Sequence, residues 1–359
     1  LQQPRRKETY VRLWICQQGR RRRDGQSISG KFRLQRLCGD QLRGVRTRMM
    51  PSTVKIGTRG SQLALWQANW VKSELSTRRP QLIVELVIIK TKGDKILDVP
   101  LAKVGGKGLF VKEIENALLT NQVDIAVHSM KDMPAEIPAG LTVGAVPERE
   151  TPWDALVSRN GERLAELPDG SRIGTSSLRR AAQLKNTRPA LEIEPLRGNL
   201  DTRLRKLHDQ KLAAIVLATA GLQRLGLDHH ITEIMDLGIM VPAVGQGALC
   251  IETRAEDPFI GPLVDEINHE PTHTAVLAER AFLKRLEGGC QVPIAGYASL
   301  EGGKVKLTGL VADLNGREII RKHITGDPED AANMGVRLAE QLLAGGADTL
   351  LKELKTGSA

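Results

Sequence analysis

Asp132 has surroundings that are suited to chemistry. It lies beside Lys131 in the stretch 128–134 (HSMKDMP), which follows an expected strand at residues 124–127. A neighbouring cation keeps a carboxylate ionised, and an ionised carboxylate can stabilise a developing positive charge or carry a proton. The alternative role is structural, because Asp132 could instead cap the turn that precedes Pro134.

Cys290 is the second candidate for chemistry. It follows two glycines at 288–289 and precedes residues 291–293 (QVP). The glycines predict a loop in which a thiol is approachable, either as a nucleophile or as an attachment point. The alternative is a small buried side chain, which is the common fate of a free cysteine. Cys250 lies in the apolar string 248–251 and is expected in the core.

Basic side chains gather where expected turns lead into helices. Arg59 lies in the turn at residues 57–61, and Arg179 and Arg180 follow the turn at residues 174–177. Helix N-termini attract anions, and guanidinium groups bind carboxylate or phosphate in a bidentate manner. These positions therefore predict an anion site, although each arginine could instead be solvated or form a surface ion pair. Further basic residues that could join the site are Lys103, Lys107, Lys131, Arg197, Arg203, Arg205 and Arg224.

Metal and nucleotide sites are not predicted. The histidines at 229–230, 269 and 273 have no cysteine or carboxylate partners at ligand spacing. Residues 105–108 (GGKG) lack the GxxxxGK[ST] pattern of a phosphate loop, and no GxGxxG stands between a strand and a helix. A nicotinamide cofactor is therefore not expected.

Strands and helices alternate through the first half of the chain. The expected elements are strand 54–56, helix 62–75, strand 82–89, helix 108–119 and strand 124–127. The mostly apolar run at 82–89, which contains Glu85, is typical of a strand buried in a parallel sheet. The alternation predicts an α/β lobe with a mostly parallel sheet, and such sheets place their chemistry at the carboxyl ends of strands.

The same pattern starts again after residue 170. The tripeptide Ile-Gly-Thr occurs at 56–58 and at 173–175, each time between an expected strand and an expected helix. A second α/β lobe is therefore predicted. Residues 147–152 and 241–247 are expected to cross between the lobes, and two crossings would give a hinged pair with a cleft.

The C-terminal part has a different pattern. A helix at 272–286, strands at 292–300, 304–311 and 318–323, and a helix at 328–343 predict a small α+β domain with an antiparallel sheet. The expected domain limits are a basic disordered tail at 1–50, domain 1 at 51–147 and 248–265, domain 2 at 153–241, and domain 3 at 270–359.

The positive charge of the chain is confined to the tail. Residues 1–48 contain 14 Lys and Arg against 3 Asp and Glu, whereas the remainder contains 38 against 39. A polyanion-binding surface on the folded body is therefore not indicated. Aromatic residues are only 3% of the chain, which argues against a base-stacking surface. No apolar run reaches the roughly 20 residues that a membrane span needs.

The tail and the cysteines bear on location. The Arg-rich, acid-poor tail is typical of an organelle transit peptide, or it is translated upstream or added sequence. The four cysteines show neither metal-type spacing nor the density of a disulfide scaffold, so a reducing cytoplasm is expected.

Seven motifs, taken in order, resemble the porphobilinogen deaminase family, which is also called hydroxymethylbilane synthase. The resemblance runs from about residue 54 to the C-terminus, and the tail has no counterpart in it. The motifs are 57–61 (GTRGS), 103–110 (KVGGKGLF), 128–134 (HSMKDMP), 174–180 (GTSSLRR), 196–199 (LRGN), 242–247 (PAVGQG) and 287–293 (EGGCQVP).

The resemblance implies two lobes like type II periplasmic binding proteins, a third domain, and a dipyrromethane cofactor joined to Cys290 by a thioether. It implies that the cofactor is assembled from the substrate, that four porphobilinogen units are added in turn, and that hydroxymethylbilane is released by hydrolysis. Asp132 would be the catalytic carboxylate. Cofactor contacts would be Lys107, Lys131, Thr175, Ser177, Arg179, Arg180 and Arg203, and substrate contacts would be Arg59, Ser61, Lys103, Arg197 and Arg224.

The expected partner is the small-molecule substrate, with a monomeric protein and neither nucleic acid nor membrane. The competing interpretation is a bilobal anion-binding module without chemistry, which would leave Asp132 and Cys290 without a role. A third interpretation, nucleic-acid binding, depends on the basic tail alone.

Overall fold

The computed structural model describes residues 52–95, 108, 110–286 and 292–356. The described residues belong to one compact unit, residues 50–359. The predictions for the basic tail, Lys103, Lys107 and Cys290 lie outside the described residues. In the described part of the chain, no helix has the length and apolar character needed to cross a membrane.

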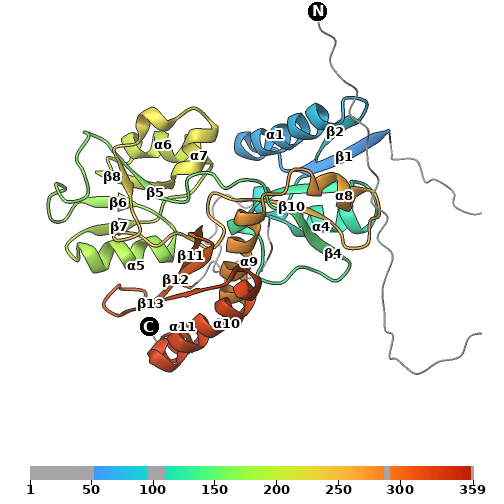
Figure 1. The fold of residues 1–359 in the computed structure, drawn as a ribbon. Helices are drawn as coiled ribbons and strands as arrows, with labels where there is room; N and C mark the ends of the chain where they lie inside the picture. The colour runs from blue at the N-terminus through green and yellow to red at the C-terminus, as the bar shows by residue number, and fades with distance from the viewer. Residues whose placement is uncertain (1–51, 96–107, 109, 287–291, 357–359) are drawn as a thin grey trace, which may run out of the picture. The chain divides into compact units, whose positions relative to one another are not determined.

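The first lobe is built on a five-stranded sheet in the order β2-β1-β3-β10-β4 (Figure 1). Its strands are β1 (Thr53–Thr58), β2 (Ile83–Ile88), β3 (Ile125–Ser129), β4 (Leu141–Ala145) and β10 (Leu249–Arg254). β1 pairs in parallel with β2 and β3, whereas β10 is antiparallel to β3 and β4. Four of the five strands therefore run in the same direction, as expected for a mostly parallel sheet, and β10, which enters from the second crossing, runs against its neighbours.

The strand at 82–89 was expected to be buried, and this expectation is wrong. β2 forms an edge of the sheet, where Ile83 and Ile88 are 57% and 59% exposed. α1 (Gln62–Arg78) and α8 (Ile260–Asp265) share one hydrophobic core with the strands, and α4 (Lys112–Leu119) forms another. Alternate residues of β3 belong to these two cores, so the helices cover both faces of the sheet.

The second lobe repeats this arrangement in the order β7-β6-β8-β5-β9. Its strands are β5 (Asp154–Ser158), β6 (Arg172–Gly174), β7 (Glu192–Glu194), β8 (Ala214–Ala218) and β9 (Glu233–Met235). β6 is parallel to β7 and β8, and β5 is antiparallel to β8 and β9. Its helices are α5 (Leu178–Thr187), α6 (Leu200–Asp209) and α7 (Thr219–Arg224). In both sheets the fourth strand arrives from the other lobe, so the predicted pair of related lobes is confirmed.

Both expected crossings are confirmed, since β4 leads into β5 and β9 leads into β10. The fully buried carboxylate of Glu279 joins them. It accepts hydrogen bonds from Arg149 Nη1 at 2.6 Å in the first crossing and from the Gly245 amide at 2.6 Å in the second. It also accepts one from the Ala298 amide at 2.8 Å. One side chain thus ties both crossings to the C-terminal part.

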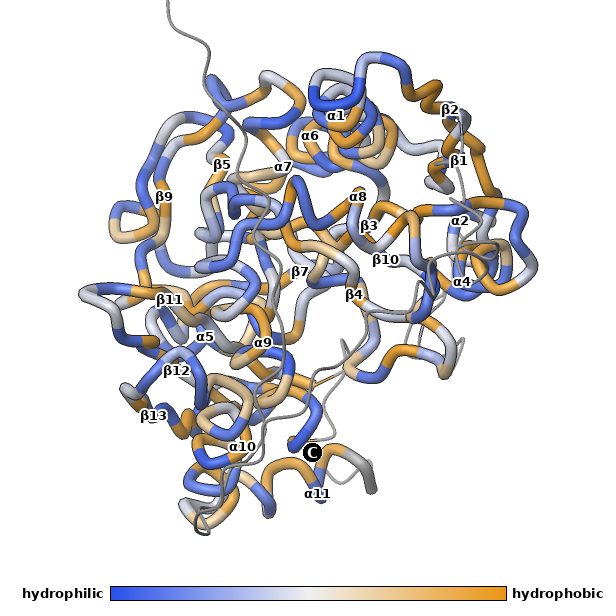
Figure 2. The backbone as a smooth tube through the Cα atoms, turned by 45° about the vertical axis from the view of Figure 1, so that its right-hand side comes forward, coloured by the Kyte–Doolittle hydropathy of each residue, from blue (hydrophilic) through white to orange (hydrophobic). Residues whose placement is uncertain are grey.

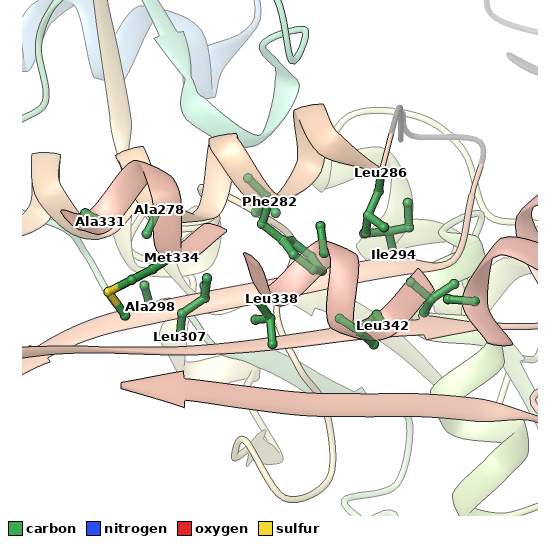
Figure 3. Packing of buried hydrophobic residues seen from close by; sticks show 14 of the residues in the cluster. Ala278, Phe282, Leu286, Ile294, Ala298, Leu307, Ala331, Met334, Leu338 and Leu342 are labelled. Atoms are coloured by element: carbon green, nitrogen blue, oxygen red, sulfur yellow. The ribbon is translucent and has the colours of Figure 1, made fainter. Parts of the chain in front are cut away.

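The C-terminal part is the expected α+β unit with an antiparallel sheet in the order β11-β12-β13. Its elements are α9 (Glu270–Arg285), β11 (Ile294–Glu301), β12 (Lys304–Ala312), β13 (Ile319–Gly326), α10 (Ala331–Leu342) and α11 (Asp348–Thr356). α9 and α10 pack on the sheet around Phe282, Met334 and Leu338 (Figure 3). Hydrophobic and hydrophilic residues are interleaved along helices such as α10, which buries one side only (Figure 2). Helix α11 was not predicted.

Candidate active site

Asp132 lies where the chain leaves the carboxyl end of β3. The next residues form a 3₁₀ turn, η1 (Met130–Asp132), and the amide of Met130 bonds the carbonyl of Ala248 at 3.0 Å, which fixes the turn against β10. The Asp132 side chain is exposed and lines a pocket with Arg59 and Ser61. Among the described residues, none donates a hydrogen bond to the Asp132 carboxylate. The alternative role of Asp132, as a cap of the turn before Pro134, is therefore not supported by any hydrogen bond.

Arg59 and Ser61 come to this pocket through the turn between β1 and α1. Ser61 is the N-cap of α1, and its Oγ accepts a hydrogen bond from the amide of Ala64 at 3.3 Å. The guanidinium of Arg59 lies 4.2 Å from the centre of the Phe110 ring and forms an ion pair with Asp94. The structure therefore brings together three of the residues that the sequence predicted for the site.

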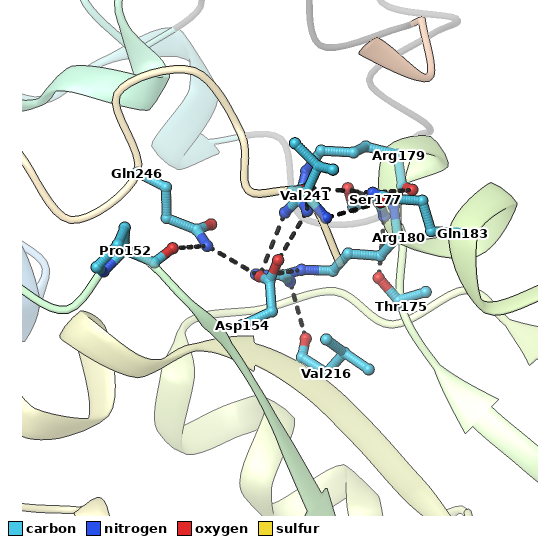
Figure 4. Close-up of polar contacts among 10 residues, drawn as sticks. All are labelled: Pro152, Asp154, Thr175, Ser177, Arg179, Arg180, Gln183, Val216, Val241 and Gln246. Carbon is cyan, nitrogen blue, oxygen red and sulfur yellow. Dashed lines mark hydrogen bonds and ion pairs between the residues drawn. The ribbon is translucent and has the colours of Figure 1, made fainter. Parts of the chain in front are cut away.

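Arg179 and Arg180 are buried, and both bind the carboxylate of Asp154 at the start of β5 (Figure 4). Arg179 Nη1 lies 2.7 Å from Asp154 Oδ2, and Arg180 Nη2 lies 2.7 Å from Oδ1. Ser177 caps α5 by accepting a hydrogen bond from the amide of Arg180, as Ser61 caps α1. The hydroxyl of Thr175 accepts a hydrogen bond from the amide of Ser177 at 3.1 Å.

The sequence-based prediction missed Asp154. The available signal was one acidic residue at the start of an apolar strand, directly after a crossing. Its side chain is fully buried, and Gln246 Nε2 donates a further hydrogen bond at 3.1 Å. Burial opposes ionisation, but the two guanidinium groups hold the pKa of the Asp154 carboxyl well below its usual range.

Lys131 and Arg203 extend this positive cluster. Burial is the main cause that lowers the pKa of Lys131 to about 8, and the positive charges of Arg180 and Arg179 act in the same direction. Burial likewise lowers the pKa of Arg203 to about 10, with Arg180 and Arg197 contributing. Asp132 opposes both shifts, so its negative charge lies within the field of the same cluster.

Arg224 has its described contacts elsewhere. Its Nη2 donates a hydrogen bond to the carbonyl of Gly247 at 2.7 Å, and its guanidinium lies 5.7 Å from the centre of the Trp66 ring. Burial lowers the pKa of Arg224 to about 10. The described contacts therefore connect Arg224 to the second crossing and to α1 rather than to Asp132.

A buried acidic group lies behind the pocket and was not predicted. Glu252 in β10 is fully buried, and its Oε2 lies 3.1 Å from Nε2 of His128. Burial, reinforced by the negative charge of Glu252, raises the pKa of the nearby Glu115 carboxyl. Cys250 is buried in the core, as expected, and burial raises the pKa of its thiol.

The charge balance of the cluster fits a ligand with several carboxylates. Four cations, Lys131, Arg179, Arg180 and Arg203, each interact electrostatically with at least one of the two carboxylates of Asp132 and Asp154. The positive charges outnumber the negative ones, and three of the four cations are guanidinium groups, which bind planar carboxylates. Together with an exposed carboxylate at a strand end, this cluster indicates a bilobal protein with a site suited to polycarboxylate anions beside an acidic group.

Comparison with known proteins identifies the family within this class. The family described as "Porphobilinogen deaminase, dipyromethane cofactor binding domain" matches residues 54–261, and the C-terminal domain of porphobilinogen deaminase matches residues 273–344. The porphobilinogen deaminase of Pelobacter propionicus is 54% identical over 306 residues, which cover 85% of this chain and 98% of the relative. That of Geobacter sulfurreducens is also 54% identical, with coverage of 85% and 96%.

The chain therefore belongs to the porphobilinogen deaminase family. It is a transferase of tetrapyrrole synthesis that joins four porphobilinogen molecules on a dipyrromethane cofactor and releases hydroxymethylbilane. This family membership indicates an enzyme and not a bilobal binding module without chemistry.

Similar solved structures are much more distant in sequence. A probable amino-acid ABC transporter extracellular-binding protein of Bacillus subtilis is 16% identical, with a TM-score of 0.38, and covers 65% of this chain and 96% of that chain. A YaeC-family lipoprotein of Enterococcus faecalis is 15% identical, with a TM-score of 0.38 and coverage of 60% and 91%.

Proposed function

We propose that Asp132 is the catalytic carboxylate of this transferase and that Cys290 is the attachment point of the dipyrromethane. The observation that carries the proposal is the exposed carboxylate of Asp132, which lines one pocket with Arg59 and lies in the field of Lys131 and Arg203. Cys290 enters the proposal from its family motif, as do Lys103 and Lys107.

The role of Asp132 follows from the charge that develops in the reaction. When ammonia leaves porphobilinogen with the electron pair of the C–N bond, the methylene carbon becomes cationic. An ionised carboxylate beside that carbon stabilises the charge. When bound, the dipyrromethane supplies the free pyrrole α-carbon that forms the new C–C bond. Asp132 then accepts the proton that this α-carbon loses.

Basic and hydroxyl side chains would hold the acetate and propionate groups. We propose Lys107, Lys131, Thr175, Ser177, Arg179, Arg180 and Arg203 for the cofactor, and Arg59, Ser61, Lys103, Arg197 and Arg224 for the substrate. Ser61 and Ser177 can serve in this way while they cap helices, because each hydroxyl accepts from an amide and keeps its own proton to donate.

The proposal includes the wider organisation of the chain. Its domain limits are a tail at 1–50, domain 1 at 51–147 and 248–265, domain 2 at 153–241, and domain 3 at 270–359. The protein would act as a cytoplasmic monomer on a small-molecule substrate, without nucleic acid or membrane.

Asp132→Asn tests the catalytic role. The substitution keeps the shape of the side chain and removes its charge, so turnover is expected to fall by about 10²-fold or more. The melting temperature and the intact mass should stay those of the cofactor-bearing enzyme. Asp169→Asn, at an exposed surface ion pair, is the matched control and should keep full activity. An active Asp132→Asn enzyme would refute the assignment.

Cys290→Ser tests the attachment point separately. The intact mass of the wild-type chain should exceed that calculated from its sequence by the mass of a dipyrromethane, and the excess should be absent from the variant. Ehrlich's aldehyde reagent should colour the wild-type protein only. A mass excess that survives in Cys290→Ser would place the thioether on another residue.

A further inference from the structure

Arg59, which lines the pocket with Asp132, already binds a carboxylate of the protein itself. Its Nε and Nη2 donate to Oδ1 of Asp94 at 3.0 Å and 2.5 Å. The edge of the guanidinium that carries Nε and Nη2 is one of the edges that can bind an external carboxylate in a bidentate manner. Asp94, in the short helix α2 (Lys92–Lys95), therefore occupies a carboxylate-binding edge of a pocket residue.

Asp94 does not depend on Arg59 for its hydrogen bonds. Its other oxygen, Oδ2, accepts from the Thr91 hydroxyl at 2.8 Å and from the Thr91 amide at 3.2 Å. If Arg59 moved to another anion, Oδ1 could be hydrated, because the Asp94 side chain is 29% exposed. Arg59 would keep its contact with the face of Phe110. Exchange of one carboxylate for another on Arg59 therefore leaves neither partner buried and unpaired.

The buried ion pairs of this chain differ in this respect. The carboxylates of Asp154 and Glu279 are fully buried, and removal of their arginines would leave an uncompensated charge in the interior. The Arg59–Asp94 pair is partly exposed on both sides, at 25% and 29%, so its net free energy is small. The first kind of pair is suited to a permanent structure and the second to exchange.

We propose that Asp94 is an internal competitor of the substrate, a carboxylate that occupies Arg59 until a substrate carboxylate displaces it. The inference rests on the proposed function, in which Arg59 binds the substrate. Its consequence is that Asp94 lowers the affinity for porphobilinogen, since the substrate carboxylate has to compete with it for Arg59.

The test measures binding without turnover. The dissociation constant of porphobilinogen is measured by calorimetry on the cofactor-bearing Asp132→Asn protein and on the Asp94→Asn/Asp132→Asn protein. The second variant should bind about twofold to fivefold more tightly, the change expected when a partly exposed competing ion pair is removed. Asp330→Asn, which removes the surface pair with Arg337, is the matched control and should not change the dissociation constant.

A double-mutant cycle separates competition from a general effect of charge or folding. In an Arg59→Gln background, Asp94→Asn should no longer tighten binding, because the competition acts through Arg59. Unchanged or weaker binding in Asp94→Asn/Asp132→Asn would overturn the proposal and make Asp94 a positioning residue for Arg59. Failure of the catalytic assignment is distinguishable from failure of this proposal, because full turnover in Asp132→Asn alone would refute the assignment before any binding is measured.

Discussion

Replacement of Asp154 by Asn removes the charge at the centre of the positive cluster while keeping the shape of the side chain. Asp154 accepts hydrogen bonds from Arg179, Arg180 and Gln246, and all of these groups are buried. Loss of one partner of a buried ion pair costs about 3 to 5 kcal/mol, because the remaining charge stays desolvated. At about 2–4 °C per kcal/mol, the melting temperature should fall by roughly 6 to 20 °C.

The pH dependence of this loss checks its cause. The pKa of the Asp154 carboxyl is depressed in the folded protein, so its stabilising effect is present above the ordinary carboxyl pKa of about 4 and is lost as the pH falls through the folded value. The melting temperatures of wild type and Asp154→Asn, measured by calorimetry, should therefore differ by a constant amount at neutral pH and converge below about pH 4.

A surface ion pair supplies the control for this prediction. Asp169 binds Arg188 at 3.1 Å but is 79% exposed, so Asp169→Asn should lower the free energy of unfolding by less than about 1 kcal/mol. If Asp154→Asn were no more destabilising than this control, or if the gap to the wild type did not narrow in acid, the view of Asp154 as a buried counter-charge would be wrong.

Three further variants test the cluster, the buried acids and the packing of the C-terminal part. Because the pKa of Lys131 is lowered to about 8, its charge is lost as the pH rises through that value; the pH profile of kcat/KM should fall above about pH 8, and Lys131→Arg should remove that decline. Burial raises the pKa of Glu115, so ionisation at higher pH destabilises the fold; Glu115→Gln should melt at a higher temperature than wild type near neutral pH, with a difference that shrinks in acid. Gly316 has φ +67°, and an added Cβ would lie 2.1 Å from the carbonyl oxygen of Ala182 in α5; Gly316→Ala should lower the melting temperature well beyond Gly303→Ala, which shares a positive φ but has no atom within 4 Å.

Local patterns were enough to predict most elements and both crossings. Ser61 and Ser177 each follow a strand and precede a helix, and such side chains satisfy the free amides of a helix N-terminus wherever the rest of the chain lies. The same local logic located Asp132 at a strand end. Proline and glycine at 147–152 and 241–247 marked the segments that connect the two sheets.

The features that were missed depend on long-range contacts. An apolar run such as 82–89 predicts a strand but not its neighbours, so the edge position of β2 was not foreseeable. The antiparallel direction of β5 and β10 follows from the crossings rather than from either strand's composition. Asp154 and Asp94 gain their roles from arginines that are 25 and 35 residues away, and no spacing rule connects such pairs.

The two carboxylates that were not predicted, Asp154 and Asp94, show how one positive site can contain both permanent and exchangeable ion pairs. Unpaired guanidinium groups are costly inside a protein, so a deep cluster such as Arg179 and Arg180 needs a permanent counter-charge, which Asp154 provides from within the fold. In the proposed function Arg179 and Arg180 contact a covalently held cofactor, which never leaves, so they can be fixed in this way. Arg59 is proposed to contact the substrate, which arrives and is consumed repeatedly, so Arg59 has to be free of a permanent ion pair. The partly exposed pair of Arg59 and Asp94 meets that requirement, because water can solvate either partner while the other is engaged. Burial, rather than the number of positive charges, therefore separates the part of the site suited to holding a tethered group from the part suited to exchange.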